Sequence, residues 1–384
     1  MIELDWAQVA ARRLQRHRLS PSTARTAPDA GRVADVVSAM CGAHAQIASA
    51  AELSIGLRLP GATRALVRRS LWTDRTVVKT RGPRGTVHLL AAADLPMWVG
   101  ALSAMPAPPW ERSVVLLTPR QTEQVLAAIA DAVAEADLTT AELTEEVVAR
   151  TGPWAGDLVV EAFQDTWPRW VAAMPAATRA GVVCFGANRG RATTYTSPTR
   201  WLPDFAPMPG RAALAGLVRG YLYAYGPATP RQFARWLGVA PEWATWLFDS
   251  ADLTEVTVEG SRAWVSAEDT EFPDRPSGLR LLPYFDAYVV GCHPRERLFP
   301  GAAAHRALAN GQAGNYPVLL VDGVVAGVWH QRRSGRSIRV TVEPLRALDA
   351  ARQRALGEEV ERVGEILEGA ASLTIGTISV GPHA

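Results

Sequence analysis

The sequence predicts an α+β protein in which helices alternate with β-hairpins along the chain. Three stretches with apolar residues at helical spacing are each followed by two strand-like segments around a turn that contains glycine. After Pro273 the pattern changes to a meander of strands and one long helix. These observations favour tandem helix–hairpin units followed by a C-terminal α+β module.

The first unit is expected to contain three helices and a basic hairpin. Helices are predicted over residues 7–18, 30–40 and 62–71, and the second carries apolar residues at helical spacing. Residues 76–90 are predicted to form two strands around the turn Gly82-Pro83-Arg84-Gly85. Helices that lead into a basic hairpin are typical of a winged helix-turn-helix unit.

A second unit repeats this order. Capping boxes at Thr118 and Thr139 predict a long helix and a shorter one. Residues 158–167 are expected to form a further helix, and residues 182–195 a second hairpin. The repetition favours a second winged-helix unit.

The third unit is predicted in the same way. A helix is expected over residues 212–223, and a capping box at Thr229 begins a helix that Gly238 ends. Residues 241–248 are expected to form the next helix, and residues 253–265 the third hairpin. Each unit is too small to bury its apolar faces well alone, so we expect the units to pack together.

The C-terminal module is expected to combine a three-stranded meander with a helix. Turns at Asp322-Gly323 and Ser334-Gly335 join the strands of the meander. The predicted elements are three strands, a charged amphipathic helix and a last strand, over residues 317–321, 324–331, 338–343, 345–367 and 372–380. The predicted domains are residues 1–110, 111–205, 206–275 and 276–384.

The composition fits a globular protein of a reducing, aqueous compartment. The 384 residues are 48% hydrophobic and 20% charged, which argues against a disordered chain. The net charge of +2 requires any nucleic-acid surface to be local. The cysteines are widely spaced, and neither a secretory signal nor a long apolar run is apparent. A soluble, cytoplasmic protein without contact to a membrane is therefore expected.

The segment His44-Ala45-Gln46 places two hydrogen-bonding side chains two positions apart among small and apolar residues. A helix would point them to nearly opposite sides, whereas an extended segment points both to one side. If both serve one site, the chain must leave the helix here. Two other interpretations stay open: the pair caps a helix C-terminus, or Cys41 and His44 form half of a zinc site, although no second ligand pair follows at suitable spacing.

Residues 64–84 form a strongly basic stretch. Seven positive charges and one negative charge, that of Asp74, give it a net charge of +6; the cations are Arg64, Arg68, Arg69, Arg75, Lys79, Arg81 and Arg84. Lys79 is the only lysine of the sequence. A solvated surface is the usual explanation of a charged run. These charges lie on a predicted helix and hairpin that could follow a phosphate backbone, so we favour contact with nucleic acid.

Two other predicted turns carry arginines. Arg189 and Arg191 lie at one of them, and the other is surrounded by Arg332, Arg333, Arg336 and Arg339. Such arginines suit contacts with phosphates or the minor groove, and they are equally compatible with an ordinary exposed turn.

Few other residues suggest chemistry. Asp286, in Leu-Leu-Pro-Tyr-Phe-Asp, is a possible catalytic residue, but a turn or a helix cap is the favoured interpretation. The sequence contains no phosphate-binding loop, dinucleotide fingerprint, HExxH or GxSxG motif. We therefore expect no cofactor and no metal.

Taken in order, these segments resemble a known family, the bacterial winged-helix DNA glycosylases typified by AlkZ and YcaQ. The resemblance covers nearly the whole chain. It rests on His44-Ala45-Gln46 ahead of a small-residue helix, and on Arg84-Gly85-Thr86-Val87-His88-Leu89, Phe185-Gly186-Ala187-Asn188-Arg189-Gly190-Arg191, Tyr225-Gly226-Pro227-Ala228-Thr229-Pro230 and Val321-Asp322-Gly323-Val324-Val325-Ala326-Gly327.

The resemblance implies tandem winged-helix units in a C-shaped arrangement around duplex DNA. It also implies monofunctional excision of N-alkylated purines, including bulky or crosslinking N7-alkylguanines, in the branch associated with self-resistance to DNA-alkylating natural products. The family's catalytic motif is usually Gln-x-Gln or Gln-x-Asp. Gln46 matches the second position of this motif and His44 replaces the first glutamine, so both are expected to be catalytic, His44 as a general base or as a hydrogen-bond partner.

The sequence thus predicts a DNA glycosylase of DNA repair that acts as a monomer on double-stranded DNA bearing an alkylated purine. Its expected DNA-binding residues are Arg64, Arg68, Lys79, Arg81, Arg84, Arg189, Arg191, Arg332, Arg333 and Arg336. The competing class is a non-enzymatic winged-helix transcriptional regulator, which would bind intact DNA with sequence preference. A protein that sequesters the alkylating compound itself is a third alternative.

Overall fold

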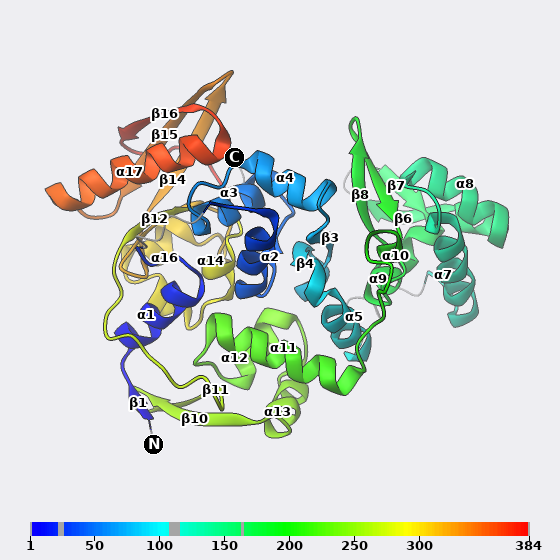
Figure 1. The fold of residues 1–384 in the computed structure, drawn as a ribbon, viewed down its shortest axis with the longest axis horizontal. Coiled ribbons are helices and arrows are strands. Elements are labelled where there is room, and N and C mark those ends of the chain that lie inside the picture. Colours follow the sequence, from blue (N-terminus) through cyan, green and yellow to red (C-terminus); the bar gives the residue numbers. More distant parts are fainter. Residues whose placement is uncertain (1, 22–26, 107–115, 163–164, 383–384) are drawn as a thin grey trace. The chain divides into compact units, whose positions relative to one another are not determined.

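The chain forms two units in the computed structural model, which describes residues 2–21, 27–106, 116–162 and 165–382 (Figure 1). The first unit comprises Met1–Val77 and Val218–Ala384, and the second comprises Val78–Leu217. The boundaries fall within strand β3 (Val77–Arg81) and helix α11 (Gly210–Tyr225). The predicted domain boundary between residues 110 and 111 lies outside the described residues.

The N-terminal part of the first unit is mainly helical. Its elements are β1 (Ile2–Leu4), α1 (Trp6–Arg16), α2 (Ala30–Ala39), β2 (Ala43–His44), α3 (Ala48–Arg58) and α4 (Arg64–Trp72). A capping box of Asp5 and Gln8 begins α1, and the Thr63 side chain caps α4. The three predicted helices of this region are confirmed to within two residues at each end.

Helix α3 is enclosed by the rest of the first unit. Every residue from Ala50 to Arg58 is buried, which explains why no amphipathic periodicity marks this helix in the sequence. Gly56 permits a close approach to α17 (Ala350–Leu367), because a Cβ atom there would lie 2.6 Å from Cγ2 of Ile366. Arg362 of α17 donates to the carbonyls of Gly56 and Leu59 at 2.8 and 2.7 Å, which caps the α3 C-terminus.

The predicted third helix–hairpin unit is present in the first unit of the structure. Its elements are α12 (Pro230–Leu237), α13 (Pro241–Asp249), β10 (Leu253–Val258) and β11 (Ser261–Ser266). The capping box of Thr229 and the left-handed Gly238 bound α12 as the sequence predicts. Strand β1 adds to the hairpin in parallel with β10, and a small core of Leu4, Val9 and Val256 lies beneath it.

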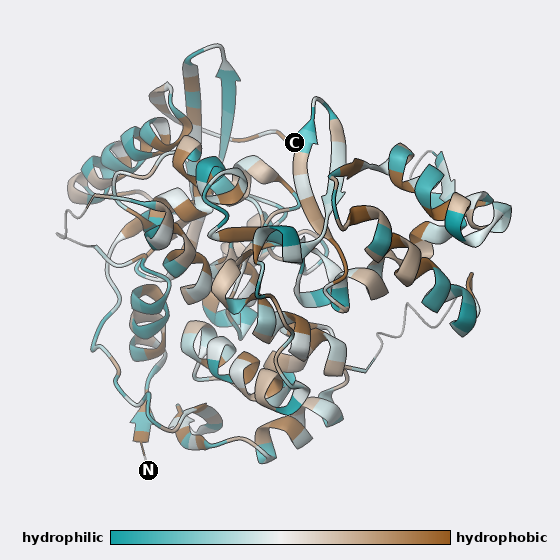
Figure 2. Cartoon of the chain, turned by 45° about the vertical axis from the view of Figure 1, so that its right-hand side comes forward, coloured by the Kyte–Doolittle hydropathy of each residue, from teal (hydrophilic) through white to brown (hydrophobic). Residues whose placement is uncertain are grey.

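A five-stranded sheet forms the C-terminal module. Its strands lie in the order β12-β13-β14-β15-β16, and only the pair β15–β16 is parallel. The elements are β12 (Leu279–Leu282), α14 (Ala287–Gly291), α15 (Arg295–Leu298), α16 (Ala302–Ala307), β13 (Val318–Val321), β14 (Val324–Ser334), β15 (Ser337–Pro344), α17 and β16 (Ala370–Ile375). The predicted meander is confirmed, and β12 extends it. Figure 2 shows that the outer end of the β14–β15 hairpin is hydrophilic.

The second unit contains three hairpins and a compact helical core. Its helices and strands are β3 (Val77–Arg81), β4 (Val87–Ala91), α5 (Leu95–Ala104), α7 (Pro119–Val133), β5 (Leu138–Thr139), α8 (Thr140–Thr151), β6 (Leu158–Ala162), β7 (Asp165–Pro168), α9 (Met174–Arg179), β8 (Cys184–Arg189), β9 (Ala192–Thr196), α10 (Pro198–Trp201) and α11 (Gly210–Tyr225). Short 3₁₀ segments lie at Pro83–Gly85, Ala92–Asp94, Pro153–Gly156 and Arg169–Ala173. The capping boxes at Thr118 and Thr139 are both formed. Trp170 is fully buried in the core, and its Nε1 donates to Thr144 at 3.0 Å.

The prediction of a helix over residues 158–167 is wrong. This stretch contributes to the antiparallel hairpin β6–β7, in which Val160 pairs with Trp167. The β-branched Val159 and Val160 favour the extended backbone. Leu158 and Trp167 are 64% and 49% exposed, so the apolar residues that suggested a buried helix face lie at the surface.

In the part of the chain that the structure describes, no helix combines the length and the apolar character that crossing a membrane would require.

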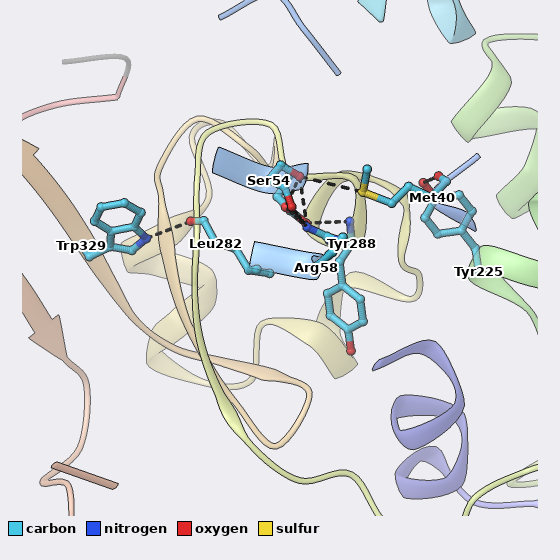
Figure 3. A network of polar contacts seen from close by, with 8 residues as sticks. Met40, Ser54, Arg58, Tyr225, Leu282, Tyr288 and Trp329 are labelled. Carbon is cyan, nitrogen blue, oxygen red and sulfur yellow. Dashed lines mark hydrogen bonds and ion pairs between the residues drawn. The ribbon is translucent and has the colours of Figure 1, made fainter. Parts of the chain in front are cut away.

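A fully buried ion pair joins α3 to the loop before α14 (Figure 3). Two guanidinium nitrogens of Arg58 contact the two carboxylate oxygens of Asp286 at 2.8 and 2.7 Å, and the Ser54 hydroxyl donates to Asp286 at 2.7 Å. Burial opposes ionisation of Asp286, but the charge and hydrogen bonds of Arg58 outweigh it and hold the pKa of this carboxyl below its ordinary value. Asp286 also accepts from the Tyr288 amide as the N-cap of α14, which confirms the predicted cap.

We expect Asp286→Asn to destabilise the first unit by about 3–5 kcal/mol, because it leaves the Arg58 charge buried without its counter-ion. Urea unfolding followed by near-ultraviolet circular dichroism measures this loss. Glu255→Gln is the control, since it breaks an exposed pair with Arg262 and should leave the midpoint almost unchanged. The double variant Arg58→Met/Asp286→Leu should recover most of the loss; a single variant as stable as the wild type would contradict the assignment.

Candidate active site

His44 and Gln46 lie on a short extended segment between α2 and α3. Ala43 and Ala45 are buried, whereas His44 is half-buried and Gln46 is exposed. This alternation of buried and less buried residues places the His44 and Gln46 side chains on the same side of the backbone. The prediction that the chain leaves the helix at this point is confirmed.

Backbone groups close the end of α2. The amides of Met40 and Gly42 donate to Val36 and Val37 at 3.1 and 3.0 Å. Cys41 adopts a left-handed φ of 54°, which turns the chain into the extended segment. Backbone amides therefore satisfy the Val36 and Val37 carbonyls at this helix end.

The zinc alternative also finds no support where the structure can be described. Among those residues, no group of three or more His, Cys, Asp or Glu side chains is arranged to hold a metal ion. Cys41 itself is buried.

An aromatic ring backs the imidazole of His44. The rings of His44 and Phe285 are stacked, with centroids 4.7 Å apart and planes inclined by 28°. Phe285 is itself fixed, because its amide donates to the Gly314 carbonyl at 3.0 Å and the next residue is the buried Asp286. The Arg58–Asp286 pair thus positions the surface on which His44 rests.

This arrangement offers neutral hydrogen-bonding chemistry. An imidazole ring can accept or donate a proton, and the Gln46 amide can donate and accept hydrogen bonds. Asp286, the adjacent carboxylate in this loop, is bonded to Arg58, Ser54 and the α14 N-terminus. The site is therefore suited to orienting a polar molecule such as water.

Three further residues of this candidate site were not predicted from the sequence: Phe285, Arg58 and Ser54. The motif Leu-Leu-Pro-Tyr-Phe-Asp signalled a cap at Asp286, but its ion pair joins residues 228 positions apart. Such a pairing leaves no local pattern in a single sequence.

The two predicted DNA-binding arginines of α4 are each paired with a carboxylate. Arg64 contacts Glu368 at 2.8 Å, and Arg68 makes two bonds with the buried Glu52 at 2.6 and 3.1 Å. The hydrogen bond that Arg68 donates to Glu52 raises the pKa of Arg68. A phosphate would have to compete with both carboxylates.

Some of the cations predicted to bind DNA from the first hairpin make contacts inside the second unit instead. Lys79 lies 5.0 Å from the ring centroid of Phe185 on β8, and burial lowers the pKa of its ammonium group. Arg81 donates to the Gly85 carbonyl at 2.9 Å, and Arg84 occupies the left-handed position of the turn. Lys79 therefore contributes to packing against the second hairpin.

The second hairpin carries one paired and one exposed arginine. Arg189 contacts Glu142 at 2.6 Å and the Asp137 carbonyl at 2.8 Å. Arg191 is exposed beside the turn at Gly190. Only Arg191 of this pair is freely presented to solvent.

The β14–β15 hairpin presents exposed cations at its outer end. Arg332, Arg336 and Arg339 are exposed, and Arg332 pairs with Arg339 across the two strands. Arg333 instead donates to the Leu367 carbonyl at 2.8 Å and to Gly335 at 2.9 Å. It therefore caps the C-terminus of α17.

Comparisons with known proteins agree on one family. The model of the family described as "DNA glycosylase AlkZ-like" matches residues 37–366. The chain is 34% identical over 342 residues to the "Interstrand DNA cross-link repair glycosylase" of Streptomyces sahachiroi, covering 85% of this chain and 88% of that protein. It also resembles the solved structure of "Streptomyces sahachiroi DNA glycosylase AlkZ", with a TM-score of 0.79, 30% identity, and coverage of 98% of this chain and 100% of the other.

The matched region contains His44, Gln46, the buried Arg58–Asp286 pair and the β14–β15 hairpin. The resemblance found in the sequence is confirmed, and it identifies an enzyme that hydrolyses the glycosidic bond of DNA. The chain belongs to the AlkZ-like DNA glycosylase family.

Proposed function

We propose that this enzyme hydrolyses the N-glycosidic bond of N7-alkylguanine in duplex DNA, including bulky adducts and crosslinks left by a genotoxic natural product. The observation that carries the proposal is the pair His44 and Gln46 on one side of an extended segment, with His44 backed by Phe285. The relative from Streptomyces sahachiroi, named as an interstrand crosslink repair glycosylase, supports the substrate class.

The reaction needs little acid catalysis from the protein. An N7-alkylated guanine already carries a positive charge, so it is a good leaving group. The oxygen of a water molecule bonds to C1′ of the sugar, the C1′–N9 bond breaks, and its electron pair neutralises the departing base. His44 takes the proton of the water and Gln46 holds the water in line; such base assistance is worth about 10²–10⁴-fold in rate.

We also propose that the helix–hairpin units are tandem winged helices that surround the duplex as a C-shaped monomer. The repeated helix–hairpin order supports this arrangement, and the proposed domains remain residues 1–110, 111–205, 206–275 and 276–384. The exposed Arg191, Arg332 and Arg336 are the best-placed contacts to phosphates. The other predicted cations would contact phosphates after leaving their present partners, or would support the neighbouring backbone. They are Arg64, Arg68, Lys79, Arg81, Arg84, Arg189 and Arg333.

Family membership favours this proposal over a transcriptional regulator. A regulator would bind intact DNA with sequence preference and release no product. A protein that sequesters the alkylating compound would bind it without DNA. Both alternatives are tested by the same base-release measurement with matched intact duplex and free compound.

Gln46→Ala should abolish release of 7-methylguanine from an alkylated duplex while leaving DNA affinity nearly unchanged, because Gln46 is exposed and acts on the attacking water. Single-turnover release followed by chromatography measures the effect. Gln124→Ala, an exposed glutamine on α7, is the matched control and should release base at the wild-type rate. Unchanged release by Gln46→Ala would refute the assignment.

His44→Ala should slow release by about 10²–10⁴-fold if His44 is the base. His44→Gln separates the two roles, since an amide can hold a water but cannot take up its proton at neutral pH. A base role predicts that His44→Gln is as slow as His44→Ala and loses the acid limb of the pH–rate profile. Full activity of His44→Gln would assign His44 as a hydrogen-bond partner.

Replacing Arg332 and Arg336 by Gln should weaken binding uniformly across DNA sequences. Each lost phosphate contact lowers the slope of log affinity against log salt by about 0.9, so the double variant should lose about 2. Arg262→Gln, on the exposed face of another hairpin, is the control and should retain the slope. An unchanged slope in the double variant would remove this hairpin from the DNA contact.

A further inference from the structure

A cavity of about 240 Å³ lies beside the proposed catalytic pair, entirely within the first unit. Its lining begins at Ile47, the residue after Gln46, and continues with Ala50 on the first turn of α3. Tyr284 contributes from the other side and directly precedes Phe285, which stacks on His44. The cavity therefore shares two backbone segments with the candidate active site.

Rigid side chains that contain rings form much of the wall of this cavity. Trp329 on β14 lines it, and its Nε1 donates to the Leu282 carbonyl at 2.9 Å (Figure 3). Pro283 and Pro317 add two further rings, and Leu53 closes the α3 side. Walls of this kind suit a planar aromatic ligand more than a flexible one.

Two polar side chains of β14, His330 and Gln331, line the same cavity. The Oε1 atom of Gln331 is buried without a hydrogen-bond partner among the described residues. A buried acceptor without a donor is destabilising, so its presence calls for a ligand that donates. Burial, aided by the charge of Arg332, lowers the pKa of His330, which favours the uncharged form of this ring.

We propose that this cavity receives the alkylated purine, with Gln331 accepting a hydrogen bond from an N–H group on the edge of the base. The proposal rests on the function proposed above and adds the site that recognises the base. The volume is below the ~300–1,000 Å³ of sites for drug-sized ligands. It therefore suits one purine ring system, while a bulky substituent would remain outside.

The edge of a guanine base matches the polar part of the cavity lining. Guanine offers N–H donors on its edge, and Gln331 offers a buried acceptor. The lowered pKa of His330 reduces its repulsion of a positively charged base. Ile47 connects this cavity to Gln46 within one residue, so a base held here would keep its glycosidic bond near the proposed water.

The test is titration of the full chain with free 7-methylguanine in the presence of a duplex that carries an abasic site. We expect binding by the wild type, and about tenfold weaker binding by Gln331→Leu, which removes the acceptor at similar volume. Ser49→Phe, at an exposed position of the lining, should block binding. Gln124→Leu on α7 is the matched control and should bind like the wild type.

The outcomes separate this proposal from the glycosylase assignment. Base release by the wild type together with unchanged titrations of Gln331→Leu and Ser49→Phe would overturn the base pocket and leave the glycosylase standing. Absence of base release with titrations that follow the expected order would overturn the enzymatic proposal and retain the pocket. Both variants should keep the wild-type urea midpoint, and a lowered midpoint with lost binding would assign the two residues to folding instead.

Discussion

The arrangement of the candidate active site depends on the buried ion pair between Arg58 and Asp286. Removing two charges from water costs several kcal/mol per ion, and only close contacts with further hydrogen bonds repay it. Here two Arg58–Asp286 contacts, the Ser54 hydroxyl and the Tyr288 amide supply those bonds. The pair fixes the position of the Phe285 loop against α3, and both elements adjoin the segment that carries His44 and Gln46.

The same pair compensates the carboxylate charge that lies next to the candidate catalytic segment. Asp286 follows Phe285 directly, yet its charge is matched by Arg58 inside the protein. A substrate that already carries a positive charge gains little from a second cation and needs no strong acid. The combination of an imidazole, an amide and an internally compensated carboxylate therefore fits the departure of a cationic base better than that of an unmodified one.

The sequence predicted most elements whose signals are local. Capping boxes at Thr118, Thr139 and Thr229, and glycine turns in the hairpins, depend on neighbouring residues and were all confirmed. The prediction of a helix over residues 158–167 was wrong because the spacing of exposed apolar residues resembled that of a buried helix face. Helix α3 gave no periodic signal because it is buried all round, and the partners of Arg64 and Arg68 came from distant or buried carboxylates. The sequence predicted a candidate site at His44 and Gln46, but Arg58, Asp286 and Phe285 meet only in the folded chain.

The departure of His44 from the glutamine usual in the related motif has a structural counterpart. An imidazole ring presents a planar face to Phe285, and the two rings stack at 4.7 Å. A glutamine amide at this position would offer a smaller planar area and more rotational freedom, so the stack holds the histidine with less loss of entropy. Phe285 in turn has little freedom, because Gly314 and Asp286 hold its backbone on either side. His44 and Phe285 therefore act as one unit. The Arg58–Asp286 pair fixes the position of the Phe285 ring, and this ring fixes the orientation of His44, the proposed general base.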